Sequence, residues 1–337
     1  MATASACSWS QRRDGICELP EAAATLLALS YMKLENRMNV LVTGGAGMIG
    51  MSLRNALTER GHVVTAIDVT DFDRDDSALE IISITDSAAL ADLFARKAFD
   101  AVIHCGAISG PMMARGEPLK IVDVNIDGTA LLLDFARRHG LRRFVFCSSI
   151  SVYGNVGKTA ITEDTPLRPT SVYGASKVAG EQLVQAFTAE YGLHGVSLRL
   201  GRVYGPYRRG NCHLATLIRD AAAGEMTEIP CDPEFLYHYV YVDDVVEAQI
   251  TALTADEFSF SAYNVGSGEA LTMPQIAEIA RAAIPGANPT LVAGADDVPD
   301  VQTTFDISRI AADLAWRPRF DLASGLRAHQ RALQPAR

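Results

Sequence analysis

Tyr173 and Lys177 are spaced so that they could remove a proton from a substrate hydroxyl. They form the pattern Tyr-x-x-x-Lys, which places a phenol and an ammonium group on one face of a helix predicted to begin near Ser171. At about 5 Å and an effective dielectric near 20, the ammonium would lower the pKa of the phenol by about two units. Tyr173 could then act as a general base near neutral pH. Taken alone, the same spacing is also found where a surface tyrosine simply stands beside a lysine. Tyr153 lacks such a partner, since Gly157 stands four residues on.

Serine hydroxyls follow a short apolar run that is typical of a buried strand. Ser149 comes just after Phe144–Cys147, at the carboxyl edge where α/β sheets bind their ligands. A hydroxyl at that edge could donate a hydrogen bond to the reacting oxygen of a substrate. Ser148 and Ser151 are alternatives, and so is an ordinary polar turn.

A glycine-rich turn lies earlier in the chain. Gly44, Gly47 and Gly50 follow a strand pattern at Asn39–Thr43, and apolar residues at helical spacing continue as far as Arg60. In a dinucleotide-binding turn the first glycine makes the tight turn, the second admits the pyrophosphate, and the third lets the helix pack closely. Free N–H groups at the start of the helix would then face the diphosphate. The pattern predicts a dinucleotide site.

Asp68 indicates which dinucleotide is bound. It ends the next predicted strand, eighteen residues past Gly50. A carboxylate there can accept hydrogen bonds from both ribose hydroxyls and would repel a 2′-phosphate. We therefore predict NAD rather than NADP.

The elements that must position these residues alternate between short apolar runs and helical patterns, as in a parallel sheet with crossover helices. The sequence predicts an α/β fold, a Rossmann doubly wound parallel sheet with a smaller, irregular C-terminal substrate lobe. The two long predicted helices are Glu117–Arg138 and Ser171–Tyr191. The predicted strands are Val40–Thr43, Val63–Ile67, Ile81–Ile84, Ala101–His104, Phe144–Cys147 and Val196–Leu200, with a further strand at Tyr237–Val242.

Three segments follow from this organisation. Residues 38–200 with 237–265 are predicted to form the NAD-binding Rossmann domain. Residues 201–236 with 266–330 are predicted to form the substrate-binding lobe. Residues 1–37 are expected to be a tail that is disordered or not native, since Met38 stands just before the first strand.

Composition narrows the function classes. The formal charge of −10 and the absence of long Lys or Arg runs argue against nucleic acid or an anionic membrane as partner. No apolar stretch has the roughly 18 to 20 residues of a membrane span. The cysteines at positions 7, 17, 105, 147, 212 and 231 form no Cys-x-x-Cys pair. We expect a cytoplasmic protein in a reducing compartment, without a metal site.

Seven segments, in this order, resemble one known family: Thr43-Gly-Gly-Ala-Gly-Met-Ile-Gly50, His104-Cys-Gly-Ala107, Asn125-Ile-Asp-Gly-Thr129, Ser148-Ser-Ile-Ser-Val-Tyr-Gly154, Ser171-Val-Tyr-Gly-Ala-Ser-Lys177, Arg199-Leu-Gly-Arg-Val-Tyr-Gly-Pro206 and Tyr239-Val-Tyr-Val-Asp-Asp-Val245. The family is the extended short-chain dehydrogenase/reductases, in the NAD-dependent epimerase/dehydratase branch. The resemblance covers about Asn39 to Arg327. It implies a carbohydrate-like small-molecule substrate and a homodimer formed through the two long helices.

The resemblance also implies residue roles. The catalytic residues would be Ser149, Tyr173 and Lys177. The predicted cofactor contacts are Gly44, Gly47, Met48, Ile49, Gly50, Asp68, Ile84, Gly106, Ala107, Asn125, Ser148, Tyr173, Lys177 and Leu200. The predicted substrate contacts are Ser109, Ser149, Ser151, Arg202, His213 and Tyr237.

Departures from the family pattern help to choose a reaction. Sugar-nucleotide 4,6-dehydratases carry Thr-Asp-Glu where this chain has Ser149-Ile150-Ser151, which argues against dehydration. Epimerases usually place Asn at the position of Arg202 and Arg at that of Tyr237, so both diphosphate contacts are changed. Arg202 could still hold a diphosphate or a substrate carboxylate in a bidentate pair.

Three functions follow. The altered contacts favour a net dehydrogenase that acts on a free sugar, sugar acid or other small hydroxy compound and releases NADH. The alternative is a nucleotide-sugar 4-epimerase, in which the hydride returns to the opposite face. A non-catalytic NAD-binding scaffold is the third, although a scaffold would not need a general base.

Other polar residues are predicted to have structural roles. His104 is expected to be a packed or hydrogen-bonded turn residue, and Trp316 a core anchor. Asp243 and Asp244 are expected to cap or brace the helix that follows them. His238, like His213, lies in the predicted lobe, where substrate contact and surface exposure are both open.

Overall fold

A seven-stranded sheet forms the centre of the structure, a computed structural model that describes residues 37–110, 112–114, 116–157, 159–208, 212–295 and 300–333. All of its strands run parallel, in the order β11-β6-β5-β4-β1-β2-β3. The predicted Rossmann fold is confirmed. The strands are β1 Asn39–Thr43, β2 Val63–Asp68, β3 Leu79–Ile81, β4 Ala101–His104, β5 Arg143–Ser149, β6 Gly195–Leu200 and β11 Ala262–Val265.

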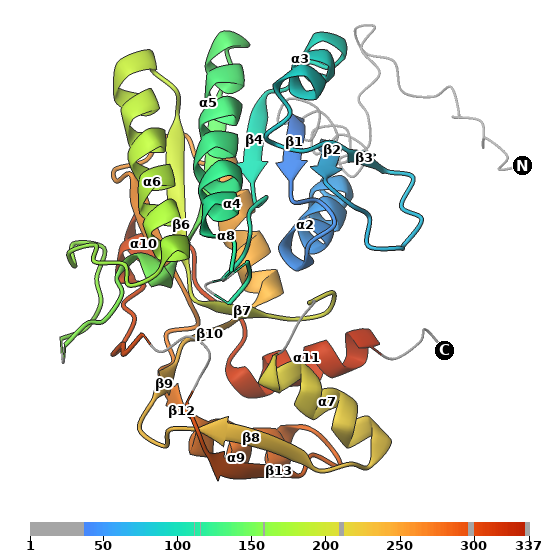
Figure 1. Ribbon diagram of the computed structural model, residues 1–337, viewed down its shortest axis with the longest axis vertical. Helices are drawn as coiled ribbons and strands as arrows, with labels where there is room; N and C mark the ends of the chain where they lie inside the picture. Colours follow the sequence, from blue (N-terminus) through green and yellow to red (C-terminus); the bar gives the residue numbers. More distant parts are fainter. Residues whose placement is uncertain are drawn as a thin grey trace, which may run out of the picture. The chain divides into compact units, whose positions relative to one another are not determined.

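Helices cover both faces of this sheet (Figure 1). On one face, α2 (Met48–Glu59) and α8 (Val242–Thr254) bury Leu53 and Val245 against the strands. On the other face lie α3 (Ser87–Arg96), α5 (Gly128–Arg138) and α6 (Val172–Tyr191), whose apolar side chains form a second core. A sheet buried on both sides explains why its strands read as continuous apolar runs.

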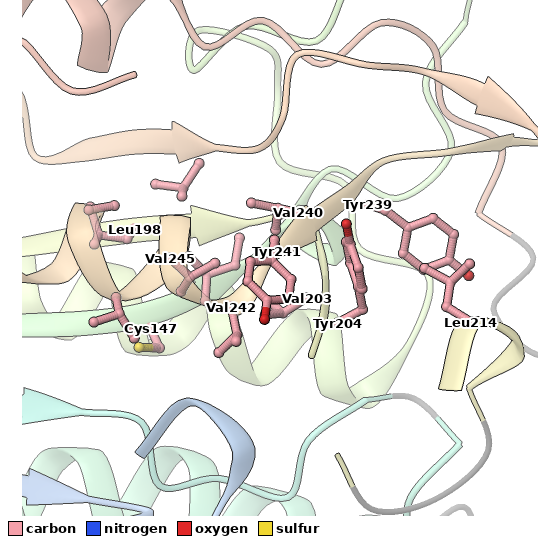
Figure 2. Close-up of a cluster of buried hydrophobic side chains, with 14 of the residues drawn as sticks. Cys147, Leu198, Val203, Tyr204, Leu214, Tyr239, Val240, Tyr241, Val242 and Val245 are labelled. Carbon is pink, nitrogen blue, oxygen red and sulfur yellow. The ribbon is translucent and has the colours of Figure 1, made fainter. Parts of the chain in front are cut away.

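A smaller group of elements lies beyond the carboxyl ends of the strands (Figure 1). Its apolar side chains form one core with those of α2 and α8. This core includes Tyr204, Leu214, Tyr239 and Tyr241, which are shown in Figure 2. The strands are β7 Arg202–Tyr204, β8 Thr227–Cys231, β9 Leu236–Tyr237, β10 Tyr239–Tyr241, β12 Leu271–Thr272 and β13 Pro289–Ala293. The helices are α7 His213–Ala223, α9 Met273–Ala283 and α11 Leu322–Leu333. A further helix, α10 Ser308–Asp313, instead contacts the edge strand β11 of the large sheet (Figure 1).

Two predicted strands are wrong in detail. The third strand ends at Ile81 rather than beginning there, because Ser83 and Asp86 close a turn and Asp86 caps α3. Its Ile84 is buried instead against Gly128 of α5. The predicted strand at 237–242 divides at His238, since β9 pairs antiparallel with β12 whereas β10 pairs parallel with β7.

One predicted helix is interrupted. The segment Glu117–Arg138 contains α4 (Pro118–Val122), one π-helical turn at Asp123–Asp127, and α5. The helix Ser171–Tyr191 is confirmed as α6, with Ser171 as its cap, whose hydroxyl accepts the N–H of Gly174 at 3.0 Å. The sequence pattern does not predict the edge strand β11.

The sheet order reverses at β1, which has β2 on one side and β4 on the other. Ligands of open α/β sheets bind outside the carboxyl ends of the strands at such a point. The turn after β1 and the turn after β4 meet there, because a side chain on Gly44 would lie 2.7 Å from the nitrogen of Gly106. Within the described part of the chain, no helix is both long and apolar enough to cross a membrane.

Candidate active site

The glycine-rich turn has the geometry expected of a diphosphate cradle. Gly44 has a φ of +67°, which other residues adopt only with strain. A side chain on Gly50 would lie 2.1 Å from the carbonyl oxygen of Gly44, so only glycine lets α2 begin this close to the turn. Gly47 is the cap residue of α2, and no side chain of the described chain caps it. The first N–H groups of α2 are therefore available to an anion.

Asp68 stands beside this turn at the end of β2. Its carboxylate accepts the N–H of Ala46 at 3.1 Å and the N–H of Val69 at 2.7 Å. Burial raises its pKa, and these hydrogen bonds and the nearby Arg74 guanidinium act in the opposite direction. The carboxylate is thus held at the position where a ribose of the dinucleotide would lie.

A cavity of about 230 Å³ begins at the start of α2 and extends across the ends of β4, β5 and β6. It brings together residues that are far apart in the sequence. The predicted site residues that line it are Met48, Ile49, Ala107, Ser109, Ser148, Ser149, Ser151, Tyr173, Lys177, Leu200, Arg202 and His213.

Tyr173 and Ser149 are neighbours in this cavity. Burial raises the pKa of the Tyr173 phenol, whereas hydrogen bonding with the hydroxyls of Ser149 and Ser109 lowers it. Arg208, which also lines the cavity, lowers the pKa of the phenol further through its charge. Two serines and one arginine therefore surround the predicted base.

Lys177 is placed differently from our expectation. Its Nζ atom donates a hydrogen bond to the carbonyl oxygen of Cys147 at 2.7 Å and lies 5.9 Å from the centre of the Tyr173 ring. Burial lowers the pKa of Lys177. The expected lowering of the pKa of Tyr173 by Lys177 is wrong for the protein alone, because burial of the phenol outweighs the charges around it.

Asn125 lies in the π-helical turn and shapes the loop after β4. Its Oδ1 atom accepts the N–H of Ile108 at 2.8 Å, and its Nδ2 atom donates to the Ile108 carbonyl and to the hydroxyl of Ser176. Ser176 donates in turn to the carbonyl oxygen of Tyr173 at 2.7 Å. A π-helical turn changes the direction in which a side chain leaves the helix. Here Asn125 thereby connects the loop after β4 to α6.

The far wall of the cavity is cationic and aromatic. The Arg202 guanidinium lies 4.9 Å from the Tyr237 ring centre and 5.9 Å from that of Phe235. Tyr237 itself is 1% exposed and stacks on Tyr239, and it is not among the described lining residues. The structure thus places the Tyr237 ring against Arg202 and Tyr239, and substrate contact by Tyr237 stays a prediction.

Other predicted roles can be compared with the contacts. His104 is buried and hydrogen-bonded to the hydroxyls of Thr43 and Thr129, as expected, and burial lowers its pKa to about 3. Trp316 is buried in the larger core. Asp244 binds the N–H groups of Arg319 and Phe320, so it braces a distant segment rather than capping α8.

Comparison with known proteins identifies the architecture. Residues 40–266 match the model of the NAD dependent epimerase/dehydratase family. The chain belongs to this family. It is 31% identical to a UDP-glucose 4-epimerase of Mycolicibacterium smegmatis over 312 residues, which cover 86% of this chain and 96% of the relative. It is 30% identical to a dTDP-glucose 4,6-dehydratase of Neisseria meningitidis, with 86% and 91% covered.

The structural comparison gives the same family. A UDP-glucose 4-epimerase of Thermus thermophilus, solved with NAD, superposes with a TM-score of 0.79 at 29% identity, covering 87% of this chain and 98% of that one. This epimerase/dehydratase family member is thus an NAD-dependent enzyme, and NAD is its cofactor. The glycine cradle, the uncapped start of α2 and Asp68 fit that cofactor.

Several lining residues of the family member were not found from sequence. Arg208 follows the predicted Arg199–Pro206 motif by two residues, so its position next to a family motif was the available signal. Asp300 and Gln302 come from the C-terminal part of the chain. No local pattern marks these two residues, because only tertiary contacts bring them to the cavity. Ile84, a predicted cofactor contact, is not among the lining residues described.

Proposed function

We propose that this enzyme is a nucleotide-sugar 4-epimerase, which oxidises one ring hydroxyl and reduces the resulting ketone from the opposite face. The observation that carries the proposal is that Ser149, Tyr173 and Lys177 share one cavity with two arginines, Arg202 and Arg208. The similarity to UDP-glucose 4-epimerases over almost their whole length supports it.

Each catalytic side chain has a role that its position allows. Tyr173 takes the proton from the substrate hydroxyl, and Ser149 donates a hydrogen bond to the same oxygen. Lys177 contributes positive charge that favours the phenolate once the site is filled. Bound NAD supplies the hydride acceptor and the positive nicotinamide charge. When the hydride has returned, Tyr173 gives back the proton.

Arg202 and Arg208 are proposed to hold the diphosphate. Both arginines line the cavity, and a guanidinium can bind phosphate oxygens with two parallel hydrogen bonds. The rings of Phe235 and Tyr237 keep Arg202 in place. His213, at the first turn of α7, lines the same cavity.

Dehydration is less well supported. Eliminating water would need an acid and a base beside the sugar. Where the dehydratases carry Asp and Glu, this chain has Ile150 and Ser151, and both line the cavity without a carboxylate. The one carboxylate among the described lining residues is Asp300, which accepts a hydrogen bond from the Thr170 hydroxyl.

A net dehydrogenase acting on a free sugar or sugar acid is the second candidate. The observation that favours it is the burial of Tyr237, because an epimerase would usually present a second diphosphate-binding arginine there. A single carboxylate could then be held by Arg202.

One assay separates the candidates. Purified protein is given NAD with a panel of nucleotide sugars, free sugars and sugar acids, while absorbance at 340 nm and the products are followed. A 4-epimeric nucleotide sugar without net NADH supports the epimerase, whereas stoichiometric NADH from a free sugar or acid supports the dehydrogenase. Tyr173→Phe should lower turnover by about 10²- to 10⁴-fold and leave NAD binding intact.

Tyr191→Phe is the matched control for this variant, since Tyr191 lies at the exposed end of the same helix. It should keep normal turnover. If Tyr173→Phe retained full activity, the assigned base would be wrong, and a biological effect that survived the substitution would favour the scaffold.

We also propose a division of the chain, a dimer and a cellular location. Residues 38–200 with 237–265 are proposed to bind NAD, and residues 201–236 with 266–330 are proposed to bind the substrate. Two copies are proposed to pair through α5 and α6, which light scattering after size exclusion would test. The free thiols of Cys105, Cys147, Cys212 and Cys231 support a reducing, cytoplasmic location.

A further inference from the structure

Two cysteines lie side by side at the edge of the active-site cavity. His104 of β4 pairs in register with Phe146 of β5, so the next residues, Cys105 and Cys147, are opposite each other. Neighbouring strands are about 4.8 Å apart, within the Cα separations of about 4.4 to 6.8 Å that disulfides span. The two Sγ atoms are 3.4 Å apart.

The surroundings of the pair suit a reactive sulfur. Gln249 of α8 is fully buried, and its Nε2 atom donates to Cys147 Sγ at 2.8 Å and to Cys105 Sγ at 3.4 Å. The thiol of Cys105, together with the charge of Lys177, lowers the pKa of Cys147. Packing alone would need only an apolar contact, such as Cys147 makes with its neighbours in the core (Figure 2). An amide that donates to both sulfurs stabilises a thiolate.

Small molecules can reach the pair. Both cysteines line the cavity of about 230 Å³, and Cys105 is partly exposed in it. Cys212 also lines this cavity, and no sulfur–sulfur contact is found for it among the described residues. Cys231 is not among the described lining residues.

We propose that Cys105 and Cys147 are a redox-sensitive dithiol, which a peroxide converts to a disulfide that switches the enzyme off. The Cys147 thiolate attacks one peroxide oxygen, the O–O bond breaks, and a sulfenic acid forms with release of water after protonation. The Cys105 thiol then attacks the sulfenic sulfur, the S–S bond forms, and a second water leaves. One hydrogen peroxide is reduced and two thiols are oxidised.

Closing this bond would disturb the catalytic residues directly. The Sγ atoms must approach from 3.4 Å to about 2.05 Å, which draws Cys105 and Cys147 together and disturbs their hydrogen bonds with Gln249. The carbonyl oxygen of Cys147 is the hydrogen-bond acceptor of Lys177. Gly106, next to Cys105, donates its N–H to the Thr43 hydroxyl beside the glycine-rich turn. The disulfide therefore pulls on the catalytic lysine and on the cofactor cradle together.

The test treats the full-length protein with hydrogen peroxide and maps its peptides without reduction. We expect a cross-linked pair of peptides containing Cys105 and Cys147, lighter by two hydrogen atoms than the reduced pair. Turnover should fall at least tenfold and return with dithiothreitol. The activity readout rests on the proposed function, whereas peptide mapping and NAD binding do not.

Two variants make the result specific. Cys147→Ser should lose the cross-link and the reversible inactivation, and Cys105→Ser serves the same purpose if the first variant folds poorly. Cys212→Ser, measured against its own starting activity, should respond as the unaltered protein does. The proposal is overturned if no Cys105–Cys147 cross-link forms, or if Cys212→Ser alone abolishes the response. A cross-link that leaves NAD binding and turnover unchanged would refute the switch.

Discussion

Replacing Glu181 by glutamine should expose how strongly the site depends on one buried ion pair. Glu181 of α6 and Arg199 of β6 have side chains that are 5% and 7% exposed. The guanidinium donates Nε to both carboxylate oxygens, at 3.0 and 3.1 Å, and Nη2 to one of them at 2.7 Å. Its Nη1 donates to the Tyr153 hydroxyl and to the Glu163 carbonyl.

The expected magnitude follows from what the substitution leaves behind. A glutamine cannot neutralise Arg199, so a buried charge loses its counter-charge, which costs about 3 to 5 kcal/mol in comparable sites. This is a large part of the roughly 5 to 15 kcal/mol by which a domain is stable. The melting temperature should fall by on the order of 10 °C. Urea unfolding followed by circular dichroism measures the free energy.

The same variant should also lower turnover. The Ser148 hydroxyl donates to a Glu181 oxygen at 2.5 Å, and Ser148 precedes the proposed catalytic Ser149. Glutamine keeps one acceptor oxygen, which must then serve both Ser148 and Arg199, so the end of β5 is held less firmly and kcat should fall more than the affinity for NAD.

A paired substitution supplies the control. In Glu181→Leu with Arg199→Met both charges are gone, and apolar replacement of a buried pair is often neutral or stabilising. The double variant should therefore be more stable than Glu181→Gln. The reasoning fails if Glu181→Gln costs less than about 1 kcal/mol, or if the double variant is no more stable than the single one.

Three other perturbations have expected outcomes. Burial lowers the pKa of His329 from 6.5 to about 4, so on acidification the unfolded chain takes up a proton first and stability is lost as pH falls below 6.5. Between pH 7.5 and pH 5 the free energy of unfolding should therefore decrease by about 2 kcal/mol less in His329→Leu than in the unaltered protein. Urea unfolding at both pH values measures this decrease, and an equal decrease in the two proteins would contradict the burial argument. Gly50→Ala should weaken NAD binding at least tenfold in calorimetry because its new carbon meets the Gly44 carbonyl, whereas Gly157→Ala, with open space around it, should not. Asp68→Ser should shift the ratio of NADP to NAD affinity upward at least tenfold, since the carboxylate that repels a 2′-phosphate is gone; an unchanged ratio would remove Asp68 from cofactor selection.

The NAD-binding part of the site could be predicted because the sequence features that mark it lie close together in the chain. The turn Gly44–Gly50, the helix after it and Asp68 lie within thirty residues, and each requires a particular backbone or charge. Tyr173 and Lys177 are likewise four residues apart on one helix. Short-range constraints of this kind are visible in a single sequence.

The errors arise where tertiary contacts override local pattern. Tyr237 belongs to an alternating aromatic run typical of a strand, but β9 and β10 pair with different partners, so the chain turns at His238. The Tyr173 pKa was expected from one charge at helical spacing, whereas burial of the phenol determines its direction. Neither the pairing partner nor the depth of burial is encoded in spacing alone.

The part of the cavity lining formed by Ile150, Asp300 and Gln302 is the extreme case, since it is built from segments about 150 residues apart. The Nε2 atom of Gln302 donates to the Ile150 carbonyl at 3.2 Å, and the N–H of Val301 donates to Asn155 at 2.8 Å. These bonds fasten the C-terminal segment to the loop that carries Ser149 and Ser151, so the position of that loop depends on residues outside every family motif in the sequence. The catalytic residues can therefore stay the same among family members while the segment around 300–302 changes which sugar fits, and substrate choice in this fold is expected to follow that segment rather than the motifs.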